Sequence, residues 1–246
     1  MTNPKFNKVS QDYDHHAHIQ HQTYDTLIKK AQQHHPRSII DIGCASGAKT
    51  QSLLSIFPHC KVFGIDMSKN MIKKAKTYQN QWLNFKHHTA EKVHELGKFD
   101  LAISNAVYQW SNSLEVSLTA LYQAINTVGY LAIYGPETYQ ELQESLRTLD
   151  PTLPNIRSKS FKDTLSIKKI VESIFPKYQL SQTIIRHRYT SIWALLQTIQ
   201  KTGVSSLSHQ GIWTKSKVNT LEKIYLNHYQ GIWASYHVIY CDVFKN

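Results

Sequence analysis

The stretch Ser38-Ile39-Ile40-Asp41-Ile42-Gly43-Cys44-Ala45-Ser46-Gly47 decides the fold class of this chain. Its isoleucines form a short apolar run that is typical of a buried strand, and its two glycines allow the backbone to turn tightly. A helical pattern follows, and a second apolar run from Val62 to Ile65 ends at Asp66. The stretch therefore predicts a strand, a ligand-binding turn and a helix within an open α/β sheet.

The spacing of the glycines and of Asp66 indicates which ligand the turn receives. Asp66 follows Gly47 by nineteen positions, where such sheets present a carboxylate to the two hydroxyls of a ribose. The loop lacks the G-x-G-x-x-G spacing of dinucleotide sites and the Lys-Ser/Thr pair of triphosphate sites. Its pattern D-x-G-x-x-x-G resembles the S-adenosylmethionine (SAM) site of class I methyltransferases. A strand-turn-helix without a ligand is the alternative.

Strand and helix patterns alternate along the rest of the chain, which favours a mostly parallel sheet. A strand is expected to end near His87. Further strands are expected at Phe99–Ala106 and Gly129–Tyr134, with a helix at Leu114–Asn126 between them. Later helices are expected at 138–149, 166–175, 192–201 and 215–229, with an edge strand at 180–187 and a last strand at 236–244. The predicted fold is Rossmann-like α/β, with a mostly parallel seven-stranded sheet, flanking helices and helical lid elements.

The chain is expected to form one SAM-dependent methyltransferase domain over residues 1–246, because no Gly/Ser-rich or Pro-rich linker interrupts it. Residues 1–35 are expected to form an amino-terminal helical lid, and residues 36–135 the SAM-binding core. Residues 136–246 would supply substrate-side helices and the last two strands.

Four segments resemble one family in more detail. They are Phe6-Asn7-Lys8 through Tyr13-Asp14 with Ala17 and Gln20, the run Ser104-Asn105-Ala106-Val107-Tyr108-Gln109-Trp110, the segment from Leu142 to Leu149, and the tail from Tyr236 to Lys245. They resemble the malonyl-acyl carrier protein O-methyltransferases of biotin synthesis, over essentially the whole chain. The Ser-Asn-x-x-x-Gln-Trp run is shared with trans-aconitate methyltransferases, so the amino-terminal pattern and the tail distinguish the two groups.

The resemblance implies a role for each matching residue. Tyr13 would close over SAM, Asp41 and the glycine loop would hold the methionyl part, and Asp66 would bind the ribose. The expected cofactor-binding residues are Tyr13, Gln20, Asp41, Gly43, Cys44, Ala45, Gly47, Asp66, Met67, Met71, Thr89, Ala90, Glu91 and Asn105. The expected catalytic residues, which would position the acceptor, are Tyr13, Tyr108, Gln109, Trp110 and Lys201. Taken without the resemblance, Tyr13 and Met67 are equally well explained as packing residues.

The sequence departs from the family pattern at three positions. Ala45 stands where glycine is usual, a modest change unless φ is positive there. Thr89 replaces the aspartate that can meet the adenine amino group. Gln197 replaces an arginine of a late helix; if that arginine binds the malonyl carboxylate, Lys201 is the nearest cation in the sequence.

The implied reaction is O-methylation of the free carboxylate of a malonyl thioester, on acyl carrier protein or coenzyme A, with S-adenosyl-L-homocysteine as the other product. A sulfonium is an activated leaving group and the carboxylate is already ionised, so alignment and desolvation matter more than a base. A trans-aconitate-like small carboxylic acid methyltransferase is the nearest alternative. An RNA methyltransferase and a non-catalytic SAM-binding module are further ones.

Positive charge is concentrated in the last part of the chain. The whole chain has a net charge of +11, and residues 151–246 hold thirteen Lys and Arg against four Asp and Glu. A patch from Arg157, Lys159, Lys162, Lys168, Lys169 and Lys201 is therefore expected to steer an acidic acyl carrier protein. Solvated lysines without a partner are the alternative, and nucleic acid is an unlikely partner because no RNA-binding module is apparent.

The chain is expected to act in the cytoplasm, and it is expected to be a monomer. The 41% hydrophobic content supports one core, and no apolar stretch is long enough to cross a bilayer. The three cysteines are scattered, which argues against a disulfide framework. Fourteen histidines include a group between His15 and His21, but no metal is expected because sulfonium chemistry needs none.

Overall fold

The computed structural model describes residues 13–202 and 214–245, which form one seven-stranded sheet. The strands are β1 Ser38–Ile42, β2 Lys61–Asp66, β3 Leu83–His87, β4 Phe99–Asn105, β5 Ile125–Tyr134, β6 Lys177–Tyr189 and β7 Ile232–Phe244. Their order is β3-β2-β1-β4-β5-β7-β6, with β1 to β5 parallel to their neighbours and β7 antiparallel to both β5 and β6. The predicted mostly parallel seven-stranded α/β sheet is confirmed.

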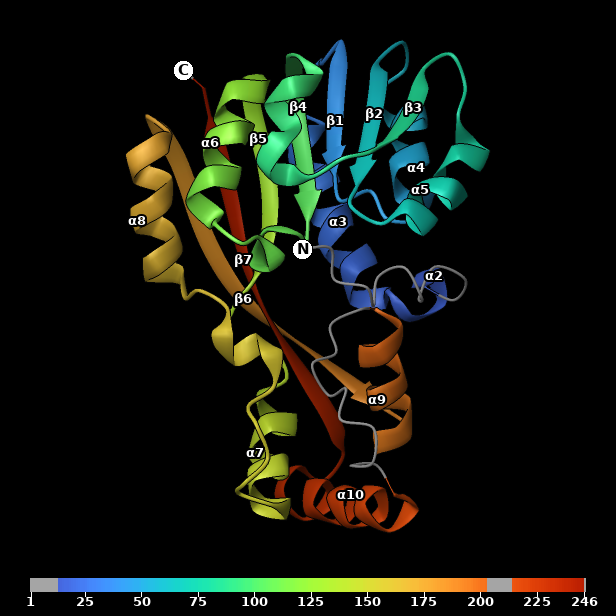
Figure 1. Ribbon diagram of the computed structural model, residues 1–246, viewed down its shortest axis with the longest axis vertical. Helices are drawn as coiled ribbons and strands as arrows, with labels where there is room; N and C mark the ends of the chain where they lie inside the picture. The colour runs from blue at the N-terminus through green and yellow to red at the C-terminus, as the bar shows by residue number, and fades with distance from the viewer. Residues whose placement is uncertain (1–12, 203–213, 246) are drawn as a thin grey trace.

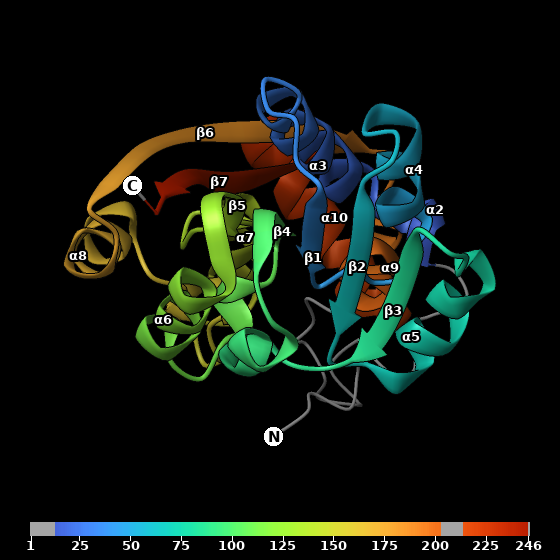
Figure 2. The same cartoon turned by 90° about the horizontal axis from the view of Figure 1, so that it is seen from above.

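Helices cover both faces of this sheet, and Figure 2 shows α3 and α6 on opposite sides of β4 and β5. The α-helices are α2 Tyr13–His16, α3 His18–Ala31, α4 Ala48–Ile56, α5 Lys69–Ala75, α6 Leu114–Ala124, α7 Gln140–Leu149, α8 Thr164–Ile174, α9 Ile192–Lys201 and α10 Lys215–Tyr229. Short 3-10 turns are η1 Lys76–Tyr78, η2 Ala90–Leu96, η3 Tyr108–Trp110 and η4 Arg157–Ser160. None of the described helices is long and apolar enough to span a membrane.

The apolar run of β1 is buried on both faces, as expected for a central parallel strand. Ile39 packs into one hydrophobic cluster with Leu27 of α3, whereas Ile40 and Ile42 pack into the opposite cluster with Leu118 of α6. The alternation of side chains along a strand explains this division. It fixes the carboxyl end of β1, and therefore Asp41 and the glycine loop, in a rigid part of the molecule.

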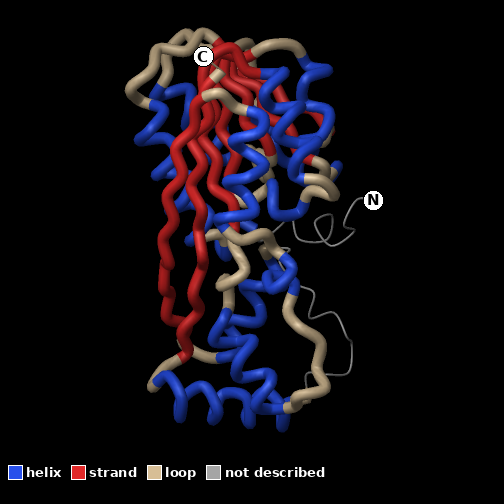
Figure 3. Tube along the Cα trace, turned by 90° about the vertical axis from the view of Figure 1, so that its left-hand side faces the viewer, coloured by secondary structure: helices blue, strands red, loops and turns tan. Residues whose placement is uncertain are grey.

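Strands β6 and β7 extend well beyond the rest of the sheet. Figures 1 and 3 show them running from the sheet to a second group of helices, α7, α9 and α10, at the other end of the molecule. Their register pairs every residue from Lys177 with Phe244 to Tyr189 with Ile232. Tyr189 and Tyr236 join the two strands through their hydroxyls, which are 2.6 Å apart. The edge position predicted for the sixth strand is confirmed.

Several predicted boundaries differ from those of the structure. The helix predicted to end at Asn126 ends at Ala124, because Ile125 is buried and pairs with Phe99 as the start of β5. Strands β6 and β7 are longer than predicted because they pair with each other beyond the sheet. Helix α7 begins at Gln140 and not at 138, since Tyr139 has a left-handed φ of 61°. The predictions about residues 1–12 and 203–213 lie outside the described residues.

Candidate functional site

Two adjoining cavities lie at the carboxyl ends of β1, β2 and β4. The larger measures about 210 Å³ and is lined by Tyr13, Ile42, Gly43, Ala45, Ile65, Asp66, Met67, Met71, His88, Thr89, Ala90, Glu91, Asn105, Ala106, Val107, Trp110, Ser111 and Asn112. The smaller measures about 30 Å³ and is lined by Tyr13, Asp14, Gln20, His21, Tyr24, Asp41, Gly43, Cys44, Ala45, Ser46, Lys49 and Asn105. Since the two share Tyr13, Gly43, Ala45 and Asn105, we treat them as one cofactor cavity.

Every predicted cofactor residue except Gly47 lines this cofactor cavity. Gly47 contributes to the turn instead, since it caps the start of α4 with a φ of 81°. Met67 lines the larger part. The individual roles of these residues stay predictions, but the structure brings the residues together.

The carboxylate of Asp41 is buried at the floor of the smaller part. Its Oδ2 accepts hydrogen bonds from the Tyr24 hydroxyl at 2.8 Å and from the Thr50 hydroxyl at 2.6 Å. Its Oδ1 has no hydrogen-bond partner. Burial raises the pKa of Asp41 to about 6, although the two hydroxyls lower it. A buried carboxylate with an unused oxygen fits a ligand that brings a cationic or N–H donor group.

Asp66 ends β2 and holds the glycine loop through its backbone. Its Oδ2 accepts a hydrogen bond of 3.1 Å from the Ala45 N–H, and its Oδ1 one of 2.7 Å from the Ser68 N–H. Burial raises the pKa of Asp66 to about 6 against these hydrogen bonds. Each carboxylate oxygen has a further lone pair, so Asp66 can still accept the two hydroxyl protons of a ribose.

The loop between β1 and α4 has three residues in the left-handed region. Gly43 and Gly47 both have a φ of 81°, and Ala45 has a φ of 48°. The N–H groups of Gly43 and Cys44 both donate to the carbonyl of Ile65, at 2.7 and 2.9 Å, which ties the loop to β2. The departure at Ala45 therefore has a physical consequence, because an alanine Cβ is strained at positive φ.

Helix α2 closes one side of the cofactor cavity. Tyr13 lines both parts, and burial together with the nearby Asp66 raises the pKa of its phenol above the usual range. Asp14 accepts hydrogen bonds from Ser46 at 2.6 Å and from Lys74 at 2.8 Å. Burial alone would raise the pKa of Asp14, but these two bonds outweigh it and hold the pKa below its ordinary value. Asp14 therefore ties α2 to Ser46 of the glycine loop between β1 and α4.

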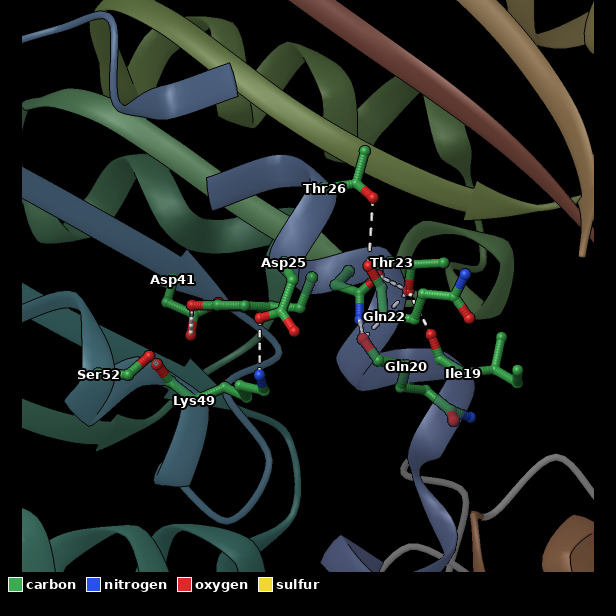
Figure 4. A network of polar contacts seen from close by, with 11 residues as sticks. Ile19, Gln20, Gln22, Thr23, Asp25, Thr26, Asp41, Lys49 and Ser52 are labelled. Atoms are coloured by element: carbon green, nitrogen blue, oxygen red, sulfur yellow. Dashed lines mark hydrogen bonds and ion pairs between the residues drawn. The ribbon is translucent and has the colours of Figure 1, made fainter. Parts of the chain in front are cut away.

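Helix α3 fixes the side chain of Asn105 at the end of β4. The Thr23 hydroxyl donates to Asn105 Oδ1 at 2.7 Å, and Asn105 Nδ2 donates to the carbonyl of Gln20 at 2.8 Å. Figure 4 shows Gln20 and Thr23 on α3, with Lys49 reaching Asp25 of the same helix. Both ends of the Asn105 amide are thus bonded to the protein, so this residue presents a fixed surface to the cavity.

The predicted acceptor-side residues are only partly brought together. Trp110 lines the cofactor cavity, whereas Tyr108 and Gln109 line a neighbouring cavity of about 370 Å³ that shares Ser111 and Asn112 with it. Lys201 ends α9 and lines neither the cofactor cavity nor this neighbour. Arg157 lines none of these cavities either, but its guanidinium lies 5.7 Å from the centre of the ring of Trp110, which does.

Several lining residues had no clear signal in the sequence. Ser46, Lys49 and His21 are polar side chains in ordinary helix and loop positions, and Lys74 binds Asp14 from sixty residues away. Only the tertiary structure brings them to the cavity. The part of the chain that the structure describes holds no group of three or more His, Cys, Asp or Glu able to bind a metal.

Comparisons with known proteins agree with this geometry. A model of the methyltransferase domain matches residues 33–191. Malonyl-[acyl-carrier protein] O-methyltransferase 2 of Ilyobacter polytropus is 30% identical, over 99% of this chain and 97% of that protein. The malonyl-[acyl-carrier protein] O-methyltransferase of Bacillus anthracis is 27% identical, over 98% of this chain and 95% of that protein.

The solved structures support the same fold. The YcgJ protein from Bacillus subtilis has a TM-score of 0.61 at 15% identity, over 92% of this chain and 99% of its own. The full-length relatives, the matching domain and the cofactor cavity together identify an enzyme that uses SAM. This chain belongs to the family of malonyl-acyl carrier protein O-methyltransferases, within the class I SAM-dependent methyltransferases.

Proposed function

We propose that this chain methylates the free carboxylate of a malonyl thioester, carried by acyl carrier protein or coenzyme A, as an early step of biotin synthesis. The observation that carries the proposal is the cofactor cavity closed by Tyr13 and Asp14, in a chain that aligns end to end with relatives of that name. The same proposal predicts a cytoplasmic place of action, where carrier-linked acyl chains are made.

The residues of the cavity fit SAM. Asp66 would accept the ribose hydroxyls, and the loop from Gly43 to Gly47 with Asp41 would hold the methionyl ammonium and carboxylate. The unpaired Oδ1 of Asp41 supports this assignment, because a buried carboxylate oxygen without a donor is costly unless a ligand supplies one. Thr89 and Ala90 line the larger part, where the adenine would lie beside Met67.

SAM supplies a methyl group on a positively charged sulfur, which is an activated leaving group. A carboxylate oxygen of the acceptor forms the new bond to the methyl carbon while the bond to sulfur breaks. The acceptor is already ionised near pH 7, so no residue has to remove a proton. The protein therefore has to align the two groups and exclude water, and Tyr13 and Trp110 supply apolar ring surface for both tasks.

A cation near the acceptor would hold the malonyl carboxylate. The sequence favours Lys201 for this task, and the structure adds Arg157, whose guanidinium lies against Trp110 on the wall of the cofactor cavity. We propose Arg157 as the first candidate because of this contact with a cavity residue. Lys201 stays a prediction.

The experiment is methyl transfer from labelled SAM to a panel of acceptors: malonyl-acyl carrier protein, malonyl-coenzyme A, trans-aconitate and bulk tRNA. The proposal expects base-labile label on the malonyl thioesters only. Label on trans-aconitate alone would indicate a small-acid methyltransferase, and label on tRNA a nucleic-acid enzyme. Binding of SAM without transfer to any acceptor would contradict the proposal and leave a binding module.

A further inference from the structure

We propose that the exposed face of α8, centred on Leu165, Lys168 and Lys169, is the surface on which the acidic carrier protein docks. The inference rests on the proposed function, and it deepens that function by assigning a place to the carrier. The sequence had pointed to a broad set of basic residues, one of which, Lys201, lies on α9. The structure separates this set into parts with different surroundings.

The exposed face of α8 has an apolar centre. Leu165 is 70% exposed, which is more than any other large apolar side chain in the described residues. It lies in the first turn of α8, while the opposite side of the helix buries Ile167 and Val171 against the core. An exposed leucine of this kind suits a protein contact better than a nucleic acid or a small molecule.

Positive charge surrounds Leu165. Residues at i+3 and i+4 share a helical face, so Lys168 and Lys169 flank Leu165, and both are exposed. Lys162 is also exposed just before the helix. Lys162 and Lys169 lie close enough to Asp163 to interact with it electrostatically. Residues 157–172 hold five basic side chains against the two acidic ones, Asp163 and Glu172.

The two acidic side chains offset only part of the positive charge of this segment, which keeps five basic side chains against two acidic ones. Asp163 caps α8 by accepting a hydrogen bond of 2.7 Å from the Ser166 N–H, and Glu172 accepts one of 2.9 Å from the Tyr178 hydroxyl near the other end of the helix. The remaining excess of positive charge can meet the carboxylates of a partner. Charge complementarity of this kind increases the rate of encounter, and an apolar centre gives the contact residence time.

The segment before α8 links this face to a residue of the cofactor cavity. Phe161 is buried, lies 5.1 Å from the ring centre of Trp110 and precedes Lys162 in the chain. Arg157 contacts the same tryptophan. Figure 1 shows the chain passing from η4 directly into α8. A partner seated on α8 therefore lies at the end of a segment that packs against Trp110 of the cavity wall, which suits a substrate carried on a long flexible arm.

The test compares two altered proteins with a matched control. Lys168→Glu with Lys169→Glu reverses the charge of the proposed surface, and Leu165→Ser removes its apolar centre. Lys215→Glu with Lys217→Glu makes the same change of net charge on the exposed first turn of α10. Each protein is titrated with malonyl-acyl carrier protein for Kd and assayed with malonyl-pantetheine, which lacks the carrier. SAM Kd and thermal unfolding confirm that each variant is folded.

We expect the α8 double variant to raise the Kd for the carrier by about tenfold or more, and Leu165→Ser by several-fold, with malonyl-pantetheine turnover unchanged. The α10 control should change the Kd by less than about twofold. Equal losses in the α8 and α10 variants, unchanged carrier binding in the α8 variants, or no carrier binding by the unaltered protein would each overturn the inference.

The same data separate this inference from the proposed function. Carrier binding that depends on α8, without methyl transfer to any malonyl acceptor, would support the docking surface and refute the proposed reaction. Methyl transfer to malonyl-pantetheine, with carrier binding that is the same in the α8 variants as in the unaltered protein, would support the proposed reaction and refute the docking surface. Loss of tRNA binding in the α8 variants, with carrier binding intact, would reassign the face to nucleic acid and overturn the inference.

Discussion

Asp14 of α2 and Lys74 of α5 form an ion pair of 2.8 Å that joins these two helices. The other oxygen of Asp14 binds Ser46 in the cofactor loop. The two bonds join three segments that are distant in the sequence, directly beside Tyr13. The position of Tyr13 over the cofactor cavity therefore depends on Asp14.

Asp14→Asn should weaken SAM binding by about tenfold, because a half-buried charge-assisted hydrogen bond contributes about 1.5–3 kcal/mol. Isothermal titration with SAM measures the effect. The control is Asp25→Asn, which breaks the more exposed pair with Lys49 and should change the Kd by less than about threefold. Equal effects of the two variants would show that Asp14 has no special role in SAM binding.

Asp66→Asn should reduce SAM affinity by about 10- to 100-fold. The single amide oxygen cannot accept the N–H groups of Ala45 and Ser68 and two ribose hydroxyls together, and the charge is lost. The measurement is the Kd for SAM, with that for S-adenosylhomocysteine beside it. Since both molecules carry the ribose, both should lose affinity equally. A loss confined to SAM would mean that Asp66 acts on the sulfonium charge.

SAM affinity should fall as the pH falls below about 6, the pKa to which burial raises Asp41 and Asp66. If one of these carboxylates must be ionised for binding, the apparent Kd at pH 5 is about ten times that at high pH. Titrations between pH 5 and 8 measure this. An affinity independent of pH over that range would contradict the assignment of both residues to the cofactor.

The same shifts have the opposite effect on the stability of the protein without ligand. A carboxyl whose pKa is higher in the folded state than in the unfolded chain binds more protons when folded, between pH 4 and about 6. Its contribution to the free energy of unfolding therefore rises as the pH falls through that window. The difference in thermal stability between the unaltered protein and Asp66→Asn should grow in favour of the unaltered protein from pH 7 to pH 5.

Ala45→Gly should stabilise the protein by about 1 kcal/mol, since it relieves the strain of an alanine at a φ of 48°. This corresponds to a rise of about 2–4 °C in Tm. The control is Ala48→Gly in the first turn of α4, where glycine should lower the Tm. A fall in Tm for Ala45→Gly would mean that the loop conformation differs from the one described.

Arg157→Gln should raise the KM for the malonyl acceptor by about tenfold and leave the Kd for SAM unchanged, if Arg157 holds the carboxylate. With malonyl-pantetheine as the acceptor, which has no carrier protein to dock, Lys159→Gln is the matched control, because Lys159 is an exposed cation on the same turn. Lys201→Gln tests the sequence prediction in the same assay. A large effect of Lys201→Gln alone would assign the binding of the malonyl carboxylate to Lys201 of α9.

The parts of the site that the sequence predicted are those carried by short local patterns. Gly43, Asp41 and Asp66 follow directly from a strand, a turn and the next strand, so their meeting at one edge is fixed by the fold class. Asp14 was visible only through the family resemblance, and its partner Lys74 was not visible at all. Such contacts depend on where the fold places α2 relative to α5, and the hydrophobic periodicity of the sequence does not indicate this.

The remaining errors have a similar cause. The helix boundary at Ile125 and the length of β6 and β7 depend on strand pairing between distant residues, such as Phe99 with Ile125. The basic residues of the last part of the chain were grouped by sequence alone. The structure places Lys168 and Lys169 on α8 and Lys201 on α9, which are separate elements.

The most direct test of the central claim is the mass of malonyl-acyl carrier protein after incubation with SAM and the purified enzyme. The account predicts a gain equal to one methylene group on the malonyl unit, strongly reduced with Asp66→Asn. An unchanged malonyl-carrier mass with an enzyme shown to bind SAM would contradict the account.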